Sequence, residues 1–204
     1  MANKLYLYPL WLRIWHATNA ILFLALVFTG LGMQYSPVDD PFMDFATTIT
    51  VHNIAGVMLL ISYLFFVVVQ LFSPNRKHYV IVFKGLMQRL LKQSRYYAYG
   101  IFKGEQAPYP VTAESKFNPL QQMSYVGVMY FLLPVLFITG LALLFPEFII
   151  QKFFGFNGTL LTALFHMLIG FLLTLFLLIH LYFASLSKKK MSNFKSMITG
   201  WHEH

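Results

Sequence analysis

Four of the seven histidines lie inside long apolar segments, where an imidazole is costly unless a ligand or partner compensates it. They are His16, His52, His166 and His180. His166 and His180 are separated by fourteen positions, which on a helix is a rise of about 21 Å and a return to within roughly 40° of the starting direction. We therefore predict two imidazoles on one side of one helix at two depths, an arrangement that suits two stacked metal centres.

The elements that must position these histidines are membrane helices. Of the 204 residues, 58% are hydrophobic and 11% are charged, whereas a soluble domain carries about 25% charged residues. The first apolar segment is too long for a signal peptide and no small-residue cleavage site follows it, so we expect it to be retained. We predict an all-α four-helix membrane bundle, one domain over residues 1–204. Its spans approach or exceed the roughly 20 residues that cross a bilayer and cover 14–33, 50–72, 122–144 and 160–185.

The distribution of charge predicts the orientation of the bundle. Eight Lys or Arg residues lie between the second and third spans and four follow the fourth. The opposite side has one basic residue, Lys152, and carries Asp39, Asp40, Asp44 and Glu147. Lys/Arg-rich loops stay cytoplasmic, so we expect both termini on the inner side of the bacterial cytoplasmic membrane. The net charge of +8 follows from this topology and from anionic lipid, and no nucleic-acid partner is expected.

The long connection 73–121 is expected to lie on the cytoplasmic side. Residues 80–103 place apolar groups at helical spacing between basic ones, a pattern typical of an amphipathic helix that lies on the inner leaflet. A solvated basic loop is the alternative.

Depth decides which histidines can share a metal centre. His16 lies near the cytoplasmic start of the first span, and His180 lies eight residues before the basic run Lys188–Lys190. His52 opens the second span and His166 lies early in the fourth, both near the outer face. Two residues can bind one ion only at similar depth. We therefore predict an inner pair, His16 with His180, and an outer pair, His52 with His166.

The absence of cysteine narrows the choice of cofactor, because it excludes the c-type haem attachment motif and thiolate-bound iron–sulfur clusters. A zinc site gathers its ligands in one tetrahedral cluster, which two pairs roughly four helical turns apart cannot form. Two imidazoles on opposite faces of a porphyrin satisfy each pair, so we predict two haems b that carry electrons without binding substrate. The alternative for any single histidine is a hydrogen-bonded packing role. His78, His202 and His204 lie outside the spans and are not expected to be ligands.

Two short motifs recur in the spans. Thr-Gly-Leu occurs in the first and third spans, and His-x-x-x-Gly occurs near the outer ends of the second and fourth. A glycine in a membrane helix permits close helix approach, and beside a histidine it equally opens space for a flat ring. The candidate cofactor-binding glycines are Gly30, Gly56, Gly140 and Gly170.

The motifs RIWHATNA, VHNIAG and H-x13-H resemble those of the bacterial di-haem cytochrome b membrane subunits, with cytochrome b561 among the wider relatives. The resemblance covers nearly the whole chain. The segment RYYAYGIFKGEQAPYPVTAESKFNPLQQMSYVGV is most similar to the thiosulfate reductase cytochrome b subunit group, with the formate dehydrogenase gamma subunit and NiFe-hydrogenase cytochrome b as wider relatives. The resemblance implies that the four paired histidines are haem ligands. It also implies a site for menaquinone or ubiquinone, and an extracytoplasmic redox subunit.

A quinone site needs a proton donor or acceptor near a haem edge. Arg13 beside His16 favours the inner haem, as does the resemblance, although Arg13 is equally suited to anchor the span or to bind a haem propionate. Phe171, Leu175 and Phe176 are expected to pack between the haems. The further quinone candidates are Asn19 and Tyr182 at the inner haem, and Asp44, Thr48 and Asn53 at the outer haem.

Three classes of function fit these residues. The favoured one is a di-haem subunit that carries electrons between the quinone pool and an outer partner, which would be an iron–sulfur and molybdenum enzyme, a hydrogenase or a multihaem cytochrome c. A self-contained membrane cytochrome that acts on a small acceptor such as superoxide is the second, although the long cytoplasmic loop is not needed for it. A haem-free anchor or small transporter is the third.

Overall fold

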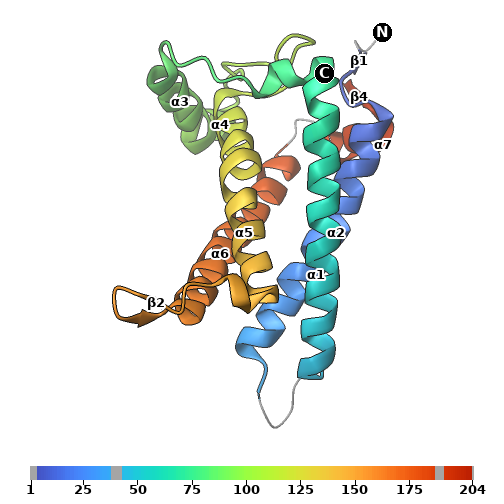
Figure 1. Cartoon of the computed structure of the whole chain (residues 1–204). Coiled ribbons are helices and arrows are strands. Elements are labelled where there is room, and N and C mark those ends of the chain that lie inside the picture. The colour runs from blue at the N-terminus through green and yellow to red at the C-terminus, as the bar shows by residue number, and fades with distance from the viewer. Residues whose placement is uncertain (1–3, 38–42, 187–190, 204) are drawn as a thin grey trace.

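The computed structural model describes residues 4–37, 43–186 and 191–203. Asp39, Asp40 and Lys188–Lys190, which contributed to the predicted orientation, lie outside the described residues. Four helices that are long and apolar enough to cross a membrane form the body of the molecule (Figure 1), as the sequence predicted. They are α1 (Leu10–Tyr35), α2 (Phe45–Phe72), a third span from Pro119 to Leu144, and α6 (Gly158–Ser185).

Polar side chains set where the spans begin. Asp44 precedes α2 and its carboxylate accepts a hydrogen bond from the backbone N–H of Thr47, while Asn157 caps α6 by accepting from the N–H of Leu160. Such caps satisfy N–H groups that the first helical turn leaves without partners. The helices therefore extend a few residues beyond the apolar stretches at these ends.

The third span is built from three helical pieces. These are α4 (Pro119–Gly127), the π-helical turn η4 (Val128–Leu132) and α5 (Leu133–Leu144). Pro134 has no backbone N–H, so the preceding turn cannot keep its regular hydrogen bonds. The carbonyl of Met129 accepts instead from the hydroxyl of Tyr63 on α2, at 2.9 Å. This contact joins the third span to α2.

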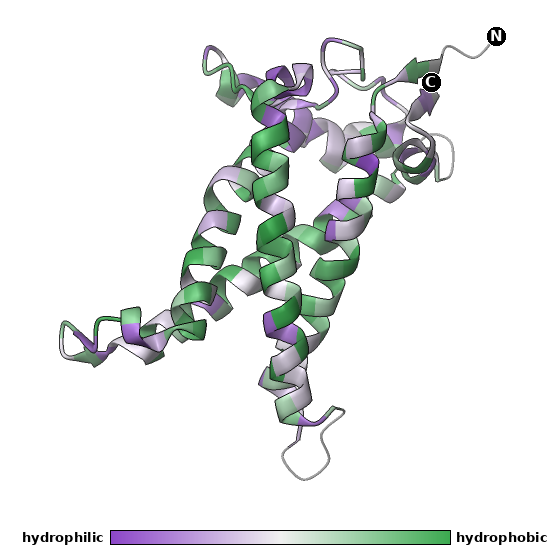
Figure 2. Ribbon diagram, turned by 45° about the vertical axis from the view of Figure 1, so that its right-hand side comes forward, coloured by the Kyte–Doolittle hydropathy of each residue, from purple (hydrophilic) through white to green (hydrophobic). Residues whose placement is uncertain are grey.

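The spans associate as two pairs. α1 packs along α2 and α5 packs along α6, and the pairs meet mainly through α2 and the third span. The pairs diverge toward the end that carries β2 (Figures 1 and 2). Among the buried side chains that join them are Leu59, Phe66 and Leu173, and Trp15 stacks on Phe66 with ring centres 4.3 Å apart.

The two ends of the bundle differ, and hydrophobic residues dominate the helices between them (Figure 2). At one end, β1 (Lys4–Tyr6) pairs antiparallel with β4 (Trp201–Glu203), so the two ends of the described chain lie together. The same end holds the connection from α2 to α4. The opposite end holds a short β2–β3 hairpin beside α6 (Figure 1). The remaining elements are η1 (Pro74–Tyr79), α3 (Leu86–Arg95), η2 (Tyr96–Gly100), η3 (Ile101–Lys103), η5 (Pro146–Phe148), β2 (Lys152–Phe153), β3 (Phe156–Asn157) and α7 (Ser192–Thr199).

The amphipathic segment expected over 80–103 is helical only from Leu86 onward, in α3, η2 and η3. Gly85 precedes it with φ of 67°, a left-handed conformation that glycine adopts without steric cost. The helix therefore begins at the residue after this glycine.

Candidate metal centres

The structure brings together both histidine pairs that depth selects. The ring centres of His16 on α1 and His180 on α6 are 6.2 Å apart. Those of His52 on α2 and His166 on α6 are 6.4 Å apart. α6 thus contributes one imidazole to each pair, and the other two imidazoles come from α1 and α2.

The ring separations fit a metal ion held between two imidazoles. A metal–imidazole bond is about 2.0 Å long and the nitrogen lies roughly 1.1 Å from its ring centre, so two rings on opposite sides of one ion have centres about 6.2 Å apart. Among the described residues, no group of three or more His, Cys, Asp or Glu side chains could hold an ion. Each pair could therefore hold a metal ion whose other ligands come from a macrocycle, as the porphyrin of haem would supply them.

Both histidines of the outer pair contact a threonine hydroxyl on the neighbouring helix. Thr29 Oγ1 lies 2.8 Å from His52 Nδ1, and Thr139 Oγ1 lies 2.9 Å from His166 Nδ1. Both threonines are buried. These are the threonines of the repeated Thr-Gly-Leu motif. The motif alone predicted no role for the hydroxyls.

The glycines of that motif face the same rings. A Cβ atom on Gly140 would lie 3.1 Å from His166 Cε1, and one on Gly30 would lie 3.7 Å from His52 Cε1. Gly56 instead faces α1, where its Cβ would meet Leu26 at 3.9 Å, and a Cβ on Gly170 would meet no described atom within 4 Å. Gly30 and Gly140 therefore lie against the histidine rings and Gly56 lies against α1, while space for a flat cofactor ring beside these glycines stays a prediction. Gly170 leaves open space one turn beyond His166.

The inner pair has aromatic neighbours. Phe176 stacks on the His180 ring at 5.9 Å, and Tyr125 from the third span contacts it edge-on at 6.0 Å. Arg13, one turn before His16, donates from its guanidinium to the backbone oxygen of Ile198. Its Nε is buried and has no hydrogen-bond partner in the described part of the chain. A buried N–H without a partner is unusual, and an anionic haem propionate would satisfy it.

The residue midway between the two α6 histidines is Leu173, which is fully buried. Phe176 also packs into the core. The expectation was wrong for Phe171 and Leu175, which are 58% and 39% exposed. At about 100° per residue, Leu173 shares the face of both histidines, whereas Phe171 lies about 140° from His166.

The candidates for quinone chemistry are distributed unevenly. Asn19 is already engaged, because its amide donates to Trp15 O at 2.6 Å and to Ser62 Oγ at 2.7 Å. Tyr182 is 52% exposed and Asn53 is exposed. Asp44 is the cap of α2, and hydrogen bonds from the backbone and side chain of Thr47 lower its pKa.

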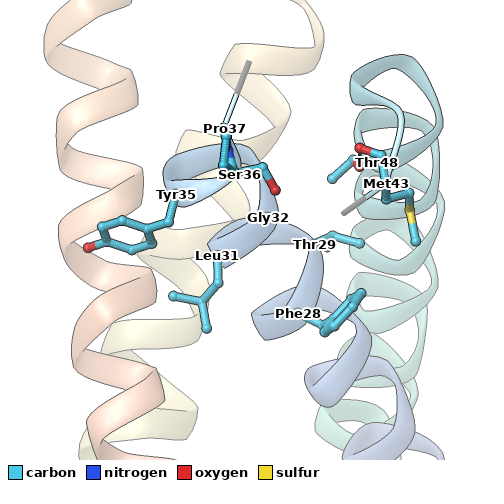
Figure 3. A pocket seen from close by; sticks show the side chains of 9 residues that line it. All are labelled: Phe28, Thr29, Leu31, Gly32, Tyr35, Ser36, Pro37, Met43 and Thr48. Carbon is cyan, nitrogen blue, oxygen red and sulfur yellow. Dashed lines mark hydrogen bonds between the residues drawn. The ribbon is translucent and has the colours of Figure 1, made fainter. Parts of the chain in front are cut away.

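Thr48 is the outer candidate that lines a cavity. This cavity of about 400 Å³ lies between the end of α1 and the start of α2 (Figure 3). Thr29 and Thr48 contribute to its wall, and its other lining residues are Phe28, Leu31, Gly32, Tyr35, Ser36, Pro37 and Met43. No histidine is among its lining residues. The cavity adjoins the outer pair through Thr29, which contacts His52.

The connection from α2 to α4 closes over the inner end of the bundle. Lys116 Nζ donates to Asn75 Oδ1 at 2.8 Å, and burial lowers the pKa of Lys116 to about 8. His78 is buried beside Phe117, and burial, with the charge of nearby lysines, lowers its pKa to about 4. The Phe117 ring contacts Tyr125 at 4.9 Å, which links this connection to the inner pair. The buried polar residues of the connection from α2 to α4 belong to no recognisable sequence motif.

Known proteins resemble this chain over nearly its whole length. The family model described as prokaryotic cytochrome b561 matches residues 7–200. The putative cytochrome YdhU of Escherichia coli strain K12 is 40% identical over 202 residues, an alignment that covers 99% of this chain and 76% of that protein. No solved structure matches. Because the family match includes all four spans and all four paired histidines, this chain belongs to the prokaryotic cytochrome b561 family, whose members are multi-pass membrane cytochromes that bind b-type haem.

Proposed function

We propose that this cytochrome holds two haems b and carries electrons between the quinone pool and a redox subunit on the outer side of the membrane. The observation that carries the proposal is the pair of ring separations, 6.2 Å and 6.4 Å, each of which fits two axial imidazoles on one iron. Haem with two axial imidazoles supplies one-electron transfer and leaves no coordination position for a substrate. In this reading His16 and His180 hold the inner haem, and His52 and His166 hold the outer haem.

The spacing along α6 sets the length of the electron path. His166 and His180 are fourteen residues apart on one uninterrupted helix, so the two irons are expected about 21 Å apart along the bundle. The porphyrin rings extend from the irons and shorten the gap between cofactor edges. Buried Leu173 occupies the interval on this helix and excludes water from it.

The quinone site is proposed beside the inner haem. Arg13 lies one turn from His16, and its unpartnered buried Nε can donate to a propionate or to a quinone oxygen. The cavity beside Thr29 and Thr48 is the alternative location, at the outer haem. Quinone turnover in Arg13→Ala and Thr48→Leu variants distinguishes these two locations.

The redox partner is proposed to dock at the end that carries β2, near the outer haem. The surface formed by the described parts of 34–49 and by 146–158 adjoins that end, and Asp44 and Glu147 contribute acidic groups to it. The partner classes are an iron–sulfur and molybdenum enzyme, a hydrogenase and a multihaem cytochrome c. Crosslinking of the native complex tests the docking surface, and crosslinks confined to the connection from α2 to α4 would overturn it.

The haem count tests the core of the proposal. Protein purified after haem-sufficient expression should give two haems b per chain in a pyridine haemochrome assay, both low-spin and six-coordinate by electron paramagnetic resonance. One haem, or high-spin five-coordinate iron, would overturn it. Oxidation of a quinol analogue without any outer partner, coupled to reduction of superoxide, would favour the self-contained cytochrome instead.

A further inference from the structure

We propose that Thr29 and Thr139 fix the tautomer of the outer haem ligands and make the outer haem the lower-potential centre of the two. This inference rests on the two-haem function proposed above. Its starting point is that each outer histidine contacts a buried threonine through Nδ1 and not through Nε2. In this account the threonines are positioning residues that act on iron through the imidazoles.

A count of protons assigns the donor in each contact. A threonine hydroxyl has one proton to donate. Thr29 Oγ1 lies 2.8 Å from the carbonyl oxygen of Ala25, and Thr139 Oγ1 lies 2.9 Å from that of Val135. These are bonds from a helical threonine to the carbonyl one turn earlier. With the hydroxyl proton used in this way, the oxygen accepts from Nδ1–H of histidine. In both outer imidazoles the proton is therefore on Nδ1, and Nε2 keeps the lone pair that a metal ligand needs.

The inner pair has no counterpart to this arrangement. Within the described residues, neither His16 nor His180 makes a hydrogen bond through its ring, and the neighbours of His180 are the rings of Phe176 and Tyr125. The two pairs have nearly the same ring separation and differ in what holds Nδ1. The repeated Thr-Gly motif therefore belongs to the outer pair alone.

The difference has a redox consequence. An acceptor on Nδ1–H increases the electron donation of the imidazole to its metal, which stabilises ferric over ferrous iron and lowers the potential. Both outer ligands carry such an acceptor, and Arg13 adds positive charge near the inner pair, which favours the reduced state there. With both haems bound, the inner centre would have the higher midpoint potential, so electron transfer from the outer side to the inner side would be downhill. The chain is poised to accept electrons from the outer partner and to deliver them to quinone.

Three single variants test the inference in the purified, haem-loaded protein. Thr29→Val and Thr139→Val keep the branched shape and remove the acceptor. Thr174→Val is the matched control, because Thr174 makes the same bond to a carbonyl one turn earlier, Gly170 O at 2.9 Å. Among the described residues, no hydrogen bond joins Thr174 to a histidine. Potentiometric titration monitored by difference spectra gives the midpoint potential of each haem. The His166→Ala variant identifies the spectral signal of the inner haem.

We expect the midpoint potential of the outer haem to rise in Thr29→Val and in Thr139→Val, and that of the inner haem to stay unchanged. Both midpoint potentials of Thr174→Val and of Thr29→Ser should match those of the wild type. If a valine variant loses the outer haem while Thr29→Ser keeps it, the hydroxyl is required for ligation and the inference holds. Two haems whose potentials do not move in the valine variants would overturn the inference and leave the proposed function standing. Equal haem loss in the control would also overturn it. A wild-type protein with a single haem would overturn the proposed function itself.

Discussion

The two motif glycines provide a matched pair of perturbations, because they face the two outer ligands at different distances. Alanine at position 140 places a methyl group 3.1 Å from His166 Cε1 and 3.6 Å from Nδ1, whereas alanine at position 30 places one 3.7 Å from His52 Cε1. The second distance is an ordinary van der Waals contact. The first is tighter than nine in ten real Cβ contacts. Gly140→Ala should therefore disturb the outer haem, and Gly30→Ala should not.

The magnitude follows from how far the ring must move. The His166 ring must give by a few tenths of an ångström to relieve the contact, while metal–ligand distances hold to within about 0.2 Å. Displacement also lengthens the hydrogen bond to Thr139. Disturbing a group that orients a ligand typically costs about 10–100-fold in metal affinity. We expect a loss of this size in outer haem affinity, equivalent to about 1.4–2.8 kcal/mol.

The assay compares the rate of haem transfer from each variant to an excess of apomyoglobin, with the pyridine haemochrome assay giving the starting stoichiometry. Difference spectra identify which haem leaves. Gly140→Ala should release the outer haem faster and retain the inner one, while Gly30→Ala should match the wild type. Equal release rates in the two variants, or wild-type retention by Gly140→Ala, would refute the reasoning that this close approach positions the ring.

Three further changes have defined outcomes. His166→Ala should remove the outer haem and leave one low-spin haem held by His16 and His180, so the haemochrome stoichiometry should fall from two to one. Leu173→Ala should open a cavity between the haems and lower the thermal midpoint of haem release, while the haem stoichiometry stays the same. The expected loss of stability is about 2–5 kcal/mol, the range for a buried Leu→Ala substitution. An unchanged midpoint would contradict the interior position of Leu173. Arg13→Ala should slow quinol turnover while both haems remain, and Thr48→Leu, which fills the outer cavity, should leave turnover intact. The reverse pattern would move the quinone site to the outer haem.

The four spans and the depth of each histidine could be predicted from the amino-acid sequence. Both properties are positions along the helix axis. The length of an apolar stretch and the fixed rise per residue are sufficient to predict such positions. The separation of fourteen positions between His166 and His180 places two imidazoles on one face of α6 whatever its neighbours are. The structure accordingly brings together His16 with His180 and His52 with His166.

Which groups meet across helices could not be predicted and follows from the packing of the folded bundle. The sequence left open whether Gly30 and Gly140 served helix approach or ring space, and it placed Phe171 and Leu175 in the interior, where Leu173 lies instead. The contacts of Thr29 with His52 and of Thr139 with His166 join residues on different helices. Such contacts depend on the rotation of each helix about its axis and on its choice of neighbour. Packing of side chains along the whole bundle sets both, and no local spacing in one span encodes them.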